Sequence, residues 1–368
     1  MSGRLSEIDQ KVLNGSVGSF REALEGGNTV GNSTEFWIGF LVVLVIALVY
    51  PLTTSAFRVS NVAFLLTFVF LGLSLGIIWG YADIFSFGQV AFFGIAGYVF
   101  GIVGGNIGGP EGTMIAFIVA VLIASGFALL LGYFMFYGGI SNVYVAIVTL
   151  VVTLVLFTFI SQTAGSEWAV GDIRLGGANG MTGIPNLEFG FGSTSIVLVD
   201  EVFYYFILGL IVALYFGLRI LVNSDYGYAM VAVRENPDRT EMFGYNTQMI
   251  KLQVFTIGGA LAGVGGVMYA SWSNFISPDV FSLSFAVLPI IWVATGGRKT
   301  IIGMILGTYA IEYLRQQLAG TGTEFAIVIV GTILLIVILY LPDGVVPRLH
   351  GRYPDIKKRI SSIRGGEQ

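Results

Sequence analysis

Long apolar runs alternate with short polar stretches along most of this chain of 368 residues. A run of about 20 apolar residues is long enough to cross a bilayer as a helix. Two of the runs, 87–105 and 284–296, are short or rich in glycine, which favours re-entrant or broken helices there. The pattern predicts an all-α integral membrane protein with about ten transmembrane or re-entrant helices. They lie near residues 36–52, 61–80, 87–105, 113–137, 140–162, 201–222, 251–272, 284–296, 300–319 and 324–341.

The polar stretches between these segments divide the chain. Residues 1–35 are polar and lack the pattern of a signal peptide, so we expect a cytoplasmic N-terminal arm. Residues 36–345 form the predicted transmembrane domain, and residues 346–368 form a basic tail. Within the domain, the two connections that stand out by their length are residues 163–200 and residues 223–250.

Lysine and arginine are distributed unevenly between alternate connections. If the N-terminus is inside, only three of the 18 basic residues fall on the outer side, namely Arg58, Arg174 and Arg315. Because basic residues accumulate in cytoplasmic loops, this asymmetry predicts that both termini are cytoplasmic. It also predicts that the connection 163–200 lies outside and the connection 223–250 inside.

Composition narrows the possible function classes. Hydrophobic residues make up 55% of the chain and charged residues 11%, far from the balance of a soluble domain. A net charge of −4 argues against nucleic-acid binding. The chain has no cysteine and one histidine, His350, so metal or catalytic sites built on these residues are excluded. No lysine completes a G-x-x-x-x-G-K-[ST] motif, so we expect no ATP and no other cofactor on this chain.

The glycine-rich run from Gly258 to Gly266 lies inside an apolar segment rather than after a strand. This position argues against a dinucleotide site. Small residues four positions apart let two helices approach closely. The pairs Gly259 with Gly263 and Ala262 with Gly266 therefore predict tight helix packing.

Few ionisable residues lie inside the apolar segments. Glu312 and Arg315 can meet on one helix face, either as a structural pair near the outer boundary or as part of a substrate site. Carriers driven by protons or sodium usually have carboxylates at mid-depth, and the near absence of these disfavours that class. The uncharged polar residues either line a translocation path or bond carbonyls of their own helices. They are Ser86, Gln89, Asn142, Thr149, Thr153 and Ser161.

The stretch "VAVRENPDRTEMFGYN", residues 231–246, places several charges between two apolar segments. Asn236-Pro237 marks a break between two short helices. We expect Asp238 to cap the second helix and Gly244 to close it. The apolar residues of this stretch would then bury against a partner protein, while the charges stay in water. These apolar residues are Val233, Met242 and Phe243, together with Met230 immediately before the stretch.

Five stretches, taken together and in order, resemble a known family. They read "GYADIFSFGQVAFFGIAGY", "NVYVAIVTLVVT", "GGANGMTGIP", "SDYGYAMVAVRENPDRTEMFGYN" and "WVATGGRKTIIGMILG". They are similar to the permeases of ABC importers of the branched-chain amino-acid and urea group, specifically to the LivM-like second permease subunit. The resemblance covers roughly residues 60–345.

The resemblance implies a permease subunit in the cell membrane that forms the translocation path of an ATP-driven importer. It implies three kinds of partner: a homologous second permease, two cytoplasmic ATPase subunits and an extracytoplasmic substrate-binding protein. It also implies that the charged stretch couples the chain to the ATPases. The coupling residues would be Ala232, Arg234, Glu235, Asp238, Arg239 and Gly244.

The resemblance leaves the solute open between branched-chain amino acids and urea or a short amide. A different class, a stand-alone channel or facilitator for a small neutral solute, also fits the uncharged polar residues. An intramembrane enzyme is disfavoured because no acid, histidine or serine dyad stands at mid-depth.

Overall fold

A computed structural model describes residues 24–320 except 192–193, together with short separate stretches between residues 328 and 348. In this part of the chain, seven helices are long and apolar enough to cross a membrane. A shorter apolar helix, α12 (Leu283–Gly296), and the helix α13 (Ile301–Gly320) follow them. The seven are α3 (Thr34–Thr53), α4 (Ala56–Ala82), α5 (Gln89–Ile107), α6 (Gly109–Tyr137), α7 (Asn142–Ser161), α8 (Asp200–Asn223) and α11 (Thr247–Ser273).

These helices confirm the predicted all-α fold, and their bounds agree with the predicted segments to within a few residues. The segment 87–105 is the continuous helix α5, and the segment 284–296 is the short helix α12, which contains Pro289. The tenth predicted segment, 324–341, lies largely outside the described residues. So do the N-terminal arm up to residue 23 and most of the basic tail.

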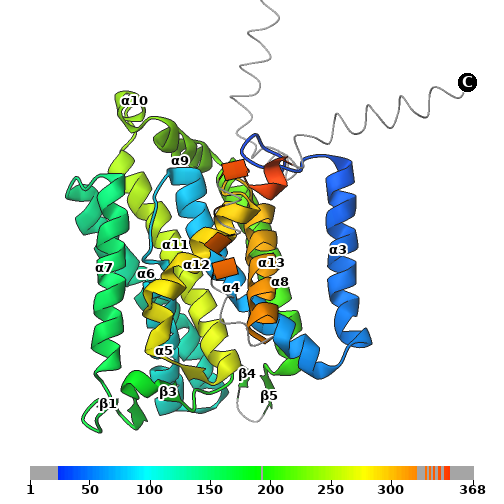
Figure 1. Cartoon of the computed structure of the whole chain (residues 1–368), viewed down its shortest axis with the longest axis vertical. Helices are drawn as coiled ribbons and strands as arrows, with labels where there is room; N and C mark the ends of the chain where they lie inside the picture. The colour runs from blue at the N-terminus through cyan, green and yellow to red at the C-terminus, as the bar shows by residue number, and fades with distance from the viewer. Residues whose placement is uncertain are drawn as a thin grey trace, which may run out of the picture.

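Helix α5 does not begin where α4 ends. Asp83 takes a left-handed conformation with φ of 54°, and the chain then runs without regular structure to Gly88. The side chain of Gln89, the first residue of α5, lies beside Ser74 of α4. Ser74 is eight residues before the end of α4, which corresponds to about 12 Å along a helix. The N-terminus of α5 therefore lies inside the protein rather than at the end of the helical bundle (Figure 1).

Small residues set the packing at the centre, where α5, α6 and α11 meet. Alanines recur every fourth residue on α6, and those from Ala116 to Ala128 are fully buried. A Cβ added at Gly259 of α11 would lie 2.3 Å from the Cβ of Ala128. One added at Gly266 would lie 1.9 Å from the backbone oxygen of Phe93 in α5. The close packing predicted from the glycine-rich run is thus confirmed.

The two ends of the bundle differ (Figure 1). One end carries two short helices, α9 (Asp225–Glu235) and α10 (Pro237–Met242). The opposite end carries three antiparallel pairs of short strands and two 3-10 turns, η1 (Gly177–Asn179) and η2 (Pro278–Phe281). The strands are β1 (Ala169–Val170) with β2 (Ile173–Arg174), β3 (Met181–Thr182) with β6 (Phe275–Ile276), and β4 (Glu188–Phe191) with β5 (Thr194–Val197).

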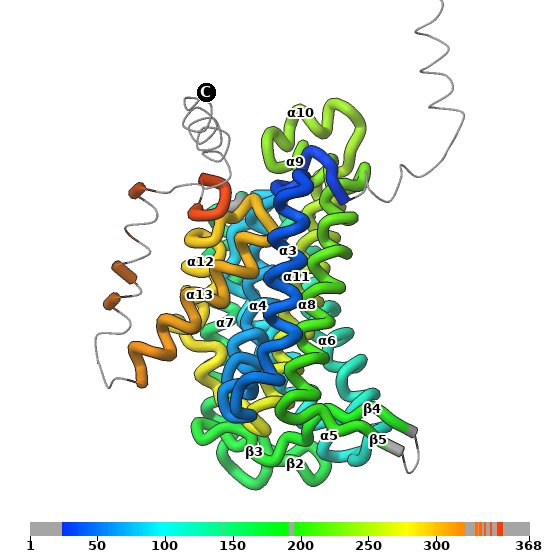
Figure 2. Tube along the Cα trace, turned by 90° about the vertical axis from the view of Figure 1, so that its right-hand side faces the viewer, coloured from blue at the N-terminus to red at the C-terminus, as the bar shows by residue number. Residues whose placement is uncertain are grey.

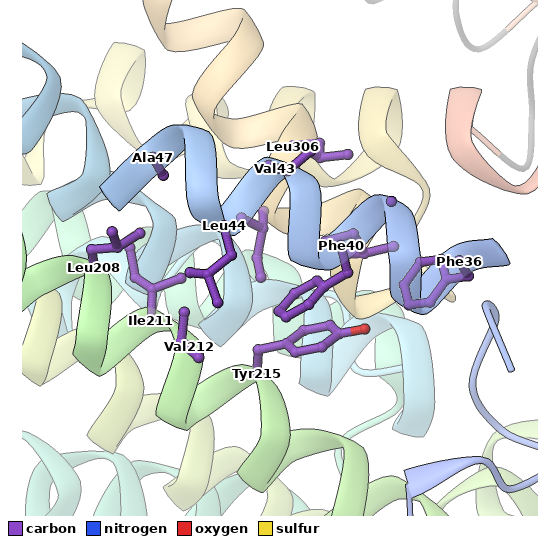
Figure 3. A pocket seen from close by; sticks show the side chains of 13 residues that line it. Phe36, Phe40, Val43, Leu44, Ala47, Leu208, Ile211, Val212, Tyr215 and Leu306 are labelled. Carbon is purple, nitrogen blue, oxygen red and sulfur yellow. The ribbon is translucent and has the colours of Figure 1, made fainter. Parts of the chain in front are cut away.

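Helix α3 stands apart from the main bundle and borders α8 (Figures 1 and 2). Near its start, the ring of Phe40 stacks on Tyr215 of α8 at 5.1 Å. Near its end, the Tyr204 hydroxyl donates to the Ala47 carbonyl at 2.9 Å. Between these contacts lies an apolar crevice of about 370 Å³, shared with α13 (Figure 3). Most of the exposed side chains of α3 are large and apolar, as expected of a helix that faces lipid.

A buried arginine ties the chain before α3 to α8. Arg219 is almost fully buried, and its Nε donates to the Leu24 carbonyl at 2.8 Å. Its other nitrogens donate to the Tyr215 hydroxyl and to Asn32 Oδ1, both at 2.7 Å. The guanidinium also lies over the ring of Trp37, 4.8 Å from its centroid. Residues 24–33 are thereby held at the same end of the bundle as α9.

Candidate functional site

The charged stretch forms two short helices, as the sequence predicted. The residue that caps the start of the second helix differs from the predicted one. Ser224 accepts a hydrogen bond from the Gly227 amide and begins α9. Asn236 accepts from the Arg239 amide at 2.9 Å and begins α10, with Pro237 in the first turn. The prediction that Asp238 caps α10 is therefore wrong, because Asn236 already occupies that position and proline needs no amide partner there. Gly244 closes α10 in the left-handed region, with φ of 88°.

The predicted common apolar face of the two helices is split. Met230 and Val233 of α9 are fully buried against the rest of this chain. Met242 and Phe243, at the end of α10, are 86% and 78% exposed. Only the second pair is therefore free to bury against another protein. Large apolar side chains held in water at a helix end are typical of an interaction surface.

Arg234 and Glu235 are neighbours with different surroundings. The Arg234 side chain is 16% exposed and its Nη1 donates to the Gly80 carbonyl, in the last turn of α4, at 2.6 Å. The Glu235 side chain is 65% exposed and accepts from Arg234 Nη2 at 2.7 Å. This hydrogen bond holds the pKa of the Glu235 carboxyl below its usual value. Arg234 thus links α9 to α4, whereas Glu235 faces outward.

The remaining residues predicted for coupling are exposed on α9, on α10 and in the turn that follows. Ala232, Glu235, Asp238, Arg239 and Gly244 are all exposed. Together with Met242 and Phe243 they form what we name the docking face. Beside it opens a recess of about 540 Å³ between the turn after α6 and the start of α11, with Asp238 in its wall. The structure brings the predicted coupling residues together, except that Arg234 points into the chain.

Three of the polar residues predicted for a translocation path meet at the N-terminus of α5. The Phe87 amide donates to Thr149 Oγ1 at 3.2 Å, and the Gly88 amide donates to Ser86 Oγ at 3.0 Å. Gln89 follows directly and contacts Ser74. Ser74 was not predicted, because its pairing across two helices leaves no local signal in the sequence.

The contacts of Ser74 fix the orientation of the Gln89 amide. Ser74 Oγ lies 2.7 Å from the Gly258 carbonyl and also within hydrogen-bonding distance of the Gln89 amide. A hydroxyl has one proton to donate and can accept as well. In the structure the amide oxygen of Gln89 faces Ser74, and the amide nitrogen has no partner among the described residues; exchanging these two atoms lets the nitrogen donate to Ser74, which then donates to the Gly258 carbonyl. This chain of bonds joins α5, α4 and α11.

Other candidates for the path bond within their own helices. Thr153 Oγ1 donates to the Thr149 carbonyl at 2.8 Å, and Ser161 Oγ donates to the Phe157 carbonyl at 2.7 Å. Asn142 is the first residue of α7. Ser86, Gln89, Thr149 and Thr153 are all buried, so within the described residues they form a closed polar cluster rather than an open passage.

The Glu312–Arg315 pair is formed within α13. Arg315 Nε donates to both carboxylate oxygens of Glu312, at 2.9 and 3.0 Å. The Glu312 side chain is 1% exposed and that of Arg315 is 36% exposed. Glu312 therefore holds the guanidinium of Arg315 in place, and one edge of that guanidinium is exposed at the surface.

Comparison with known proteins agrees with these features. A family model described as "Branched-chain amino acid transport system / permease component" matches residues 55–338. The chain is 25% identical to the high-affinity branched-chain amino acid transport system permease protein LivM of Salmonella typhimurium, over 91% of this chain and 80% of that protein. The LivM protein of Escherichia coli is 24% identical over the same shares.

A further relative is archaeal. The probable LivM permease protein of Methanocaldococcus jannaschii is 24% identical over 45% of this chain and 52% of that protein. No solved structure matches this chain. The match to the family model, together with the apolar helices, makes the chain a multi-pass protein of the cell membrane. It belongs to the family of permease components of branched-chain amino acid transport systems.

Proposed function

We propose that this chain is one permease subunit of an ATP-driven importer that carries branched-chain amino acids across the cell membrane. The docking face carries the proposal on the structural side. It exposes Met242 and Phe243 beside charged side chains at one end of a membrane-spanning bundle. The names of the similar LivM proteins support the choice of solute.

The proposal requires other subunits. A second, homologous permease would complete the translocation path, because the polar cluster around Gln89 is closed within the described part of this chain. Two ATPase subunits would bind ATP in the cytoplasm and contact the docking face. A binding protein would deliver the solute at the opposite end, where the short strands lie.

The surroundings of Arg234 and Phe243 suggest different tasks. Phe243 is exposed at the end of α10 and suits the centre of an interface with an ATPase. Arg234 reaches the Gly80 carbonyl, three residues before the irregular segment that leads to Gln89. Movement of α9 would therefore act on the end of α4 and on the segment that positions the N-terminus of α5.

Co-purification from cells that express the whole importer tests this proposal. Phe243→Glu should reduce recovery of the ATPase subunits at least about tenfold, because it places a charge in an apolar contact. Ile196→Glu, an equally drastic change at an exposed position in β5 at the opposite end, should leave recovery unchanged. Equal recovery with both variants would contradict the docking face.

Transport measured in the same preparations separates docking from transmission. Arg234→Gln should keep the ATPases bound but lower leucine uptake and the ATPase activity stimulated by the loaded binding protein. In liposomes, this chain alone should pass no leucine. Passive flux through the isolated chain would favour a stand-alone channel, and uptake of urea in place of leucine would correct the solute.

A further inference from the structure

A further pocket lies at the end that carries the short strands. It is formed by η2, the first half of α12, Arg315 of α13 and Gly331, and its volume is about 460 Å³. Pockets for small molecules fall in this range of volume. The lining residues are Asp279, Ser282, Leu283, Ser284, Phe285, Val287, Leu288, Ile291, Arg315 and Gly331.

The pocket has side chains of opposite charge. Asp279 is exposed, and among the described residues its carboxylate accepts one long hydrogen bond, from Ser277 Oγ at 3.3 Å. It therefore keeps most of its capacity to accept hydrogen bonds. In α13, Glu312 holds Arg315 through Nε and Nη2 of the arginine. Among the described residues, Nη1 of Arg315 donates no hydrogen bond, so this edge of the guanidinium is available to a ligand.

The charge balance selects the ligand class. Glu312 compensates Arg315, and among the described lining residues Asp279 adds a further negative charge, so this part of the wall does not attract a simple anion. A carboxylate bound at Arg315 is favoured only if the same molecule also brings a cation to Asp279. Apart from Ser282 and Ser284, the described rest of the wall is apolar and accepts a hydrocarbon side chain, chiefly at Phe285, Leu288 and Ile291.

We propose that this pocket binds a free amino acid with an apolar side chain, as a zwitterion. The ammonium group would contact Asp279, the carboxylate would contact Arg315, and the side chain would lie against α12. This inference rests on the proposed function, which turns the strand-bearing end toward the outside. The pocket is then an entry site, where the solute first meets this subunit after the binding protein releases it.

Direct binding tests the proposal without transport. The assembled importer in nanodiscs, with no binding protein present, is titrated with tritiated leucine. Unlabelled leucine should displace the label, whereas isocaproate, which lacks the ammonium group, and isoamylamine, which lacks the carboxylate, should fail at the same concentration. Displacement by isoamylamine alone would indicate a cation site and overturn the proposal. Displacement by urea would indicate a neutral amide site and overturn it as well.

Variants locate the site. Asp279→Asn should weaken leucine binding at least about tenfold, because a charge-assisted hydrogen bond is lost. Leu288→Trp should abolish binding by filling the pocket. The matched controls are Asp172→Asn, at an exposed aspartate of the same end, and Leu306→Trp, in the apolar crevice beside α3. Neither control should change binding.

Arg315→Lys is a milder second variant, since lysine keeps the charge beside buried Glu312 and loses the free edge of the fork. It should weaken leucine binding while the complex still assembles. If the wild-type importer transports leucine but Asp279→Asn binds and transports it with unchanged affinity, the pocket is refuted and the proposed function stands. If the wild-type complex neither assembles nor transports leucine, the proposed function itself fails.

Discussion

Polar side chains inside this protein bond to elements that are distant in sequence. Arg219 bonds to Leu24, 195 residues away, and Ser74 bonds to Gly258, 184 residues away. The sequence identified Ser86, Gln89 and Thr149 as candidates because a polar residue in an apolar run is conspicuous. It did not indicate that these three meet, nor that Ser74 joins them, because such pairings depend on how helices pack. For the same reason, the sequence did not indicate that the Arg234 side chain is mostly buried while that of Glu235 is exposed.

Ser74→Ala tests whether the bonds around Gln89 stabilise the bundle. Loss of the hydroxyl leaves the buried Gln89 amide without its partner, which should lower the free energy of unfolding by about 1 kcal/mol. Ser125→Ala is the matched control, because among the described residues its hydroxyl bonds only to the Val121 carbonyl of its own helix. Thermal unfolding in detergent should shift for the first variant and stay unchanged for the second. Equal shifts would show that the contact with Gln89 contributes nothing.

At the scale of elements, helix positions were predictable because the spans are long and almost wholly apolar. The structures of the connections between helices were less predictable. The sequence predicts Asp238 as the cap of α10, yet Asn236 takes this position, because both residue types cap helices and Pro237 can stand either just before the cap or in the first turn. The alanines of α6 do not stand out in the sequence, because alanine is common in any apolar run. Only the structure shows that they contact α11.

Gly266→Ala tests the contact between α5 and α11. The added methyl group would overlap the Phe93 carbonyl, so the helices must separate, which should lower the free energy of unfolding by about 3 kcal/mol or prevent assembly. Gly209→Ala on α8 is the control, because nothing lies within 4 Å of a Cβ added there. That change should be neutral or slightly stabilising. Purified yield and thermal unfolding in detergent measure both, and a Gly266→Ala protein as stable as the control would refute the close approach.

At the scale of the whole molecule, basic residues separate between the two ends. Arg219, Arg234 and Arg298 lie near the end that carries α9, whereas Arg174 lies in β2 at the other end. The sequence predicted this division from the order of spans alone. It did not predict the short strands, because pairs of two to four residues leave no periodic pattern.

Labelling of single cysteines tests the predicted orientation. The chain has no cysteine of its own, so each introduced thiol reports alone. A membrane-impermeant maleimide added to intact cells should label Asp172→Cys, at the strand-bearing end, and should not label Asp238→Cys on the docking face. After the cells are opened, both should react, because both positions are exposed. The reverse pattern would invert the molecule and refute the orientation.

The bond between Arg219 and the chain before α3 has a consequence for biosynthesis. The ribosome completes Leu24 long before Arg219, and α3 to α7 are made in between. Until residues 24–33 fold back, the arginine of α8 has none of its carbonyl and amide acceptors from that loop. A charge without partners is costly within an apolar helix. Helix α3 therefore reaches its final place only after α8 has been inserted, so the first membrane-spanning helix of the described residues is among the last to settle.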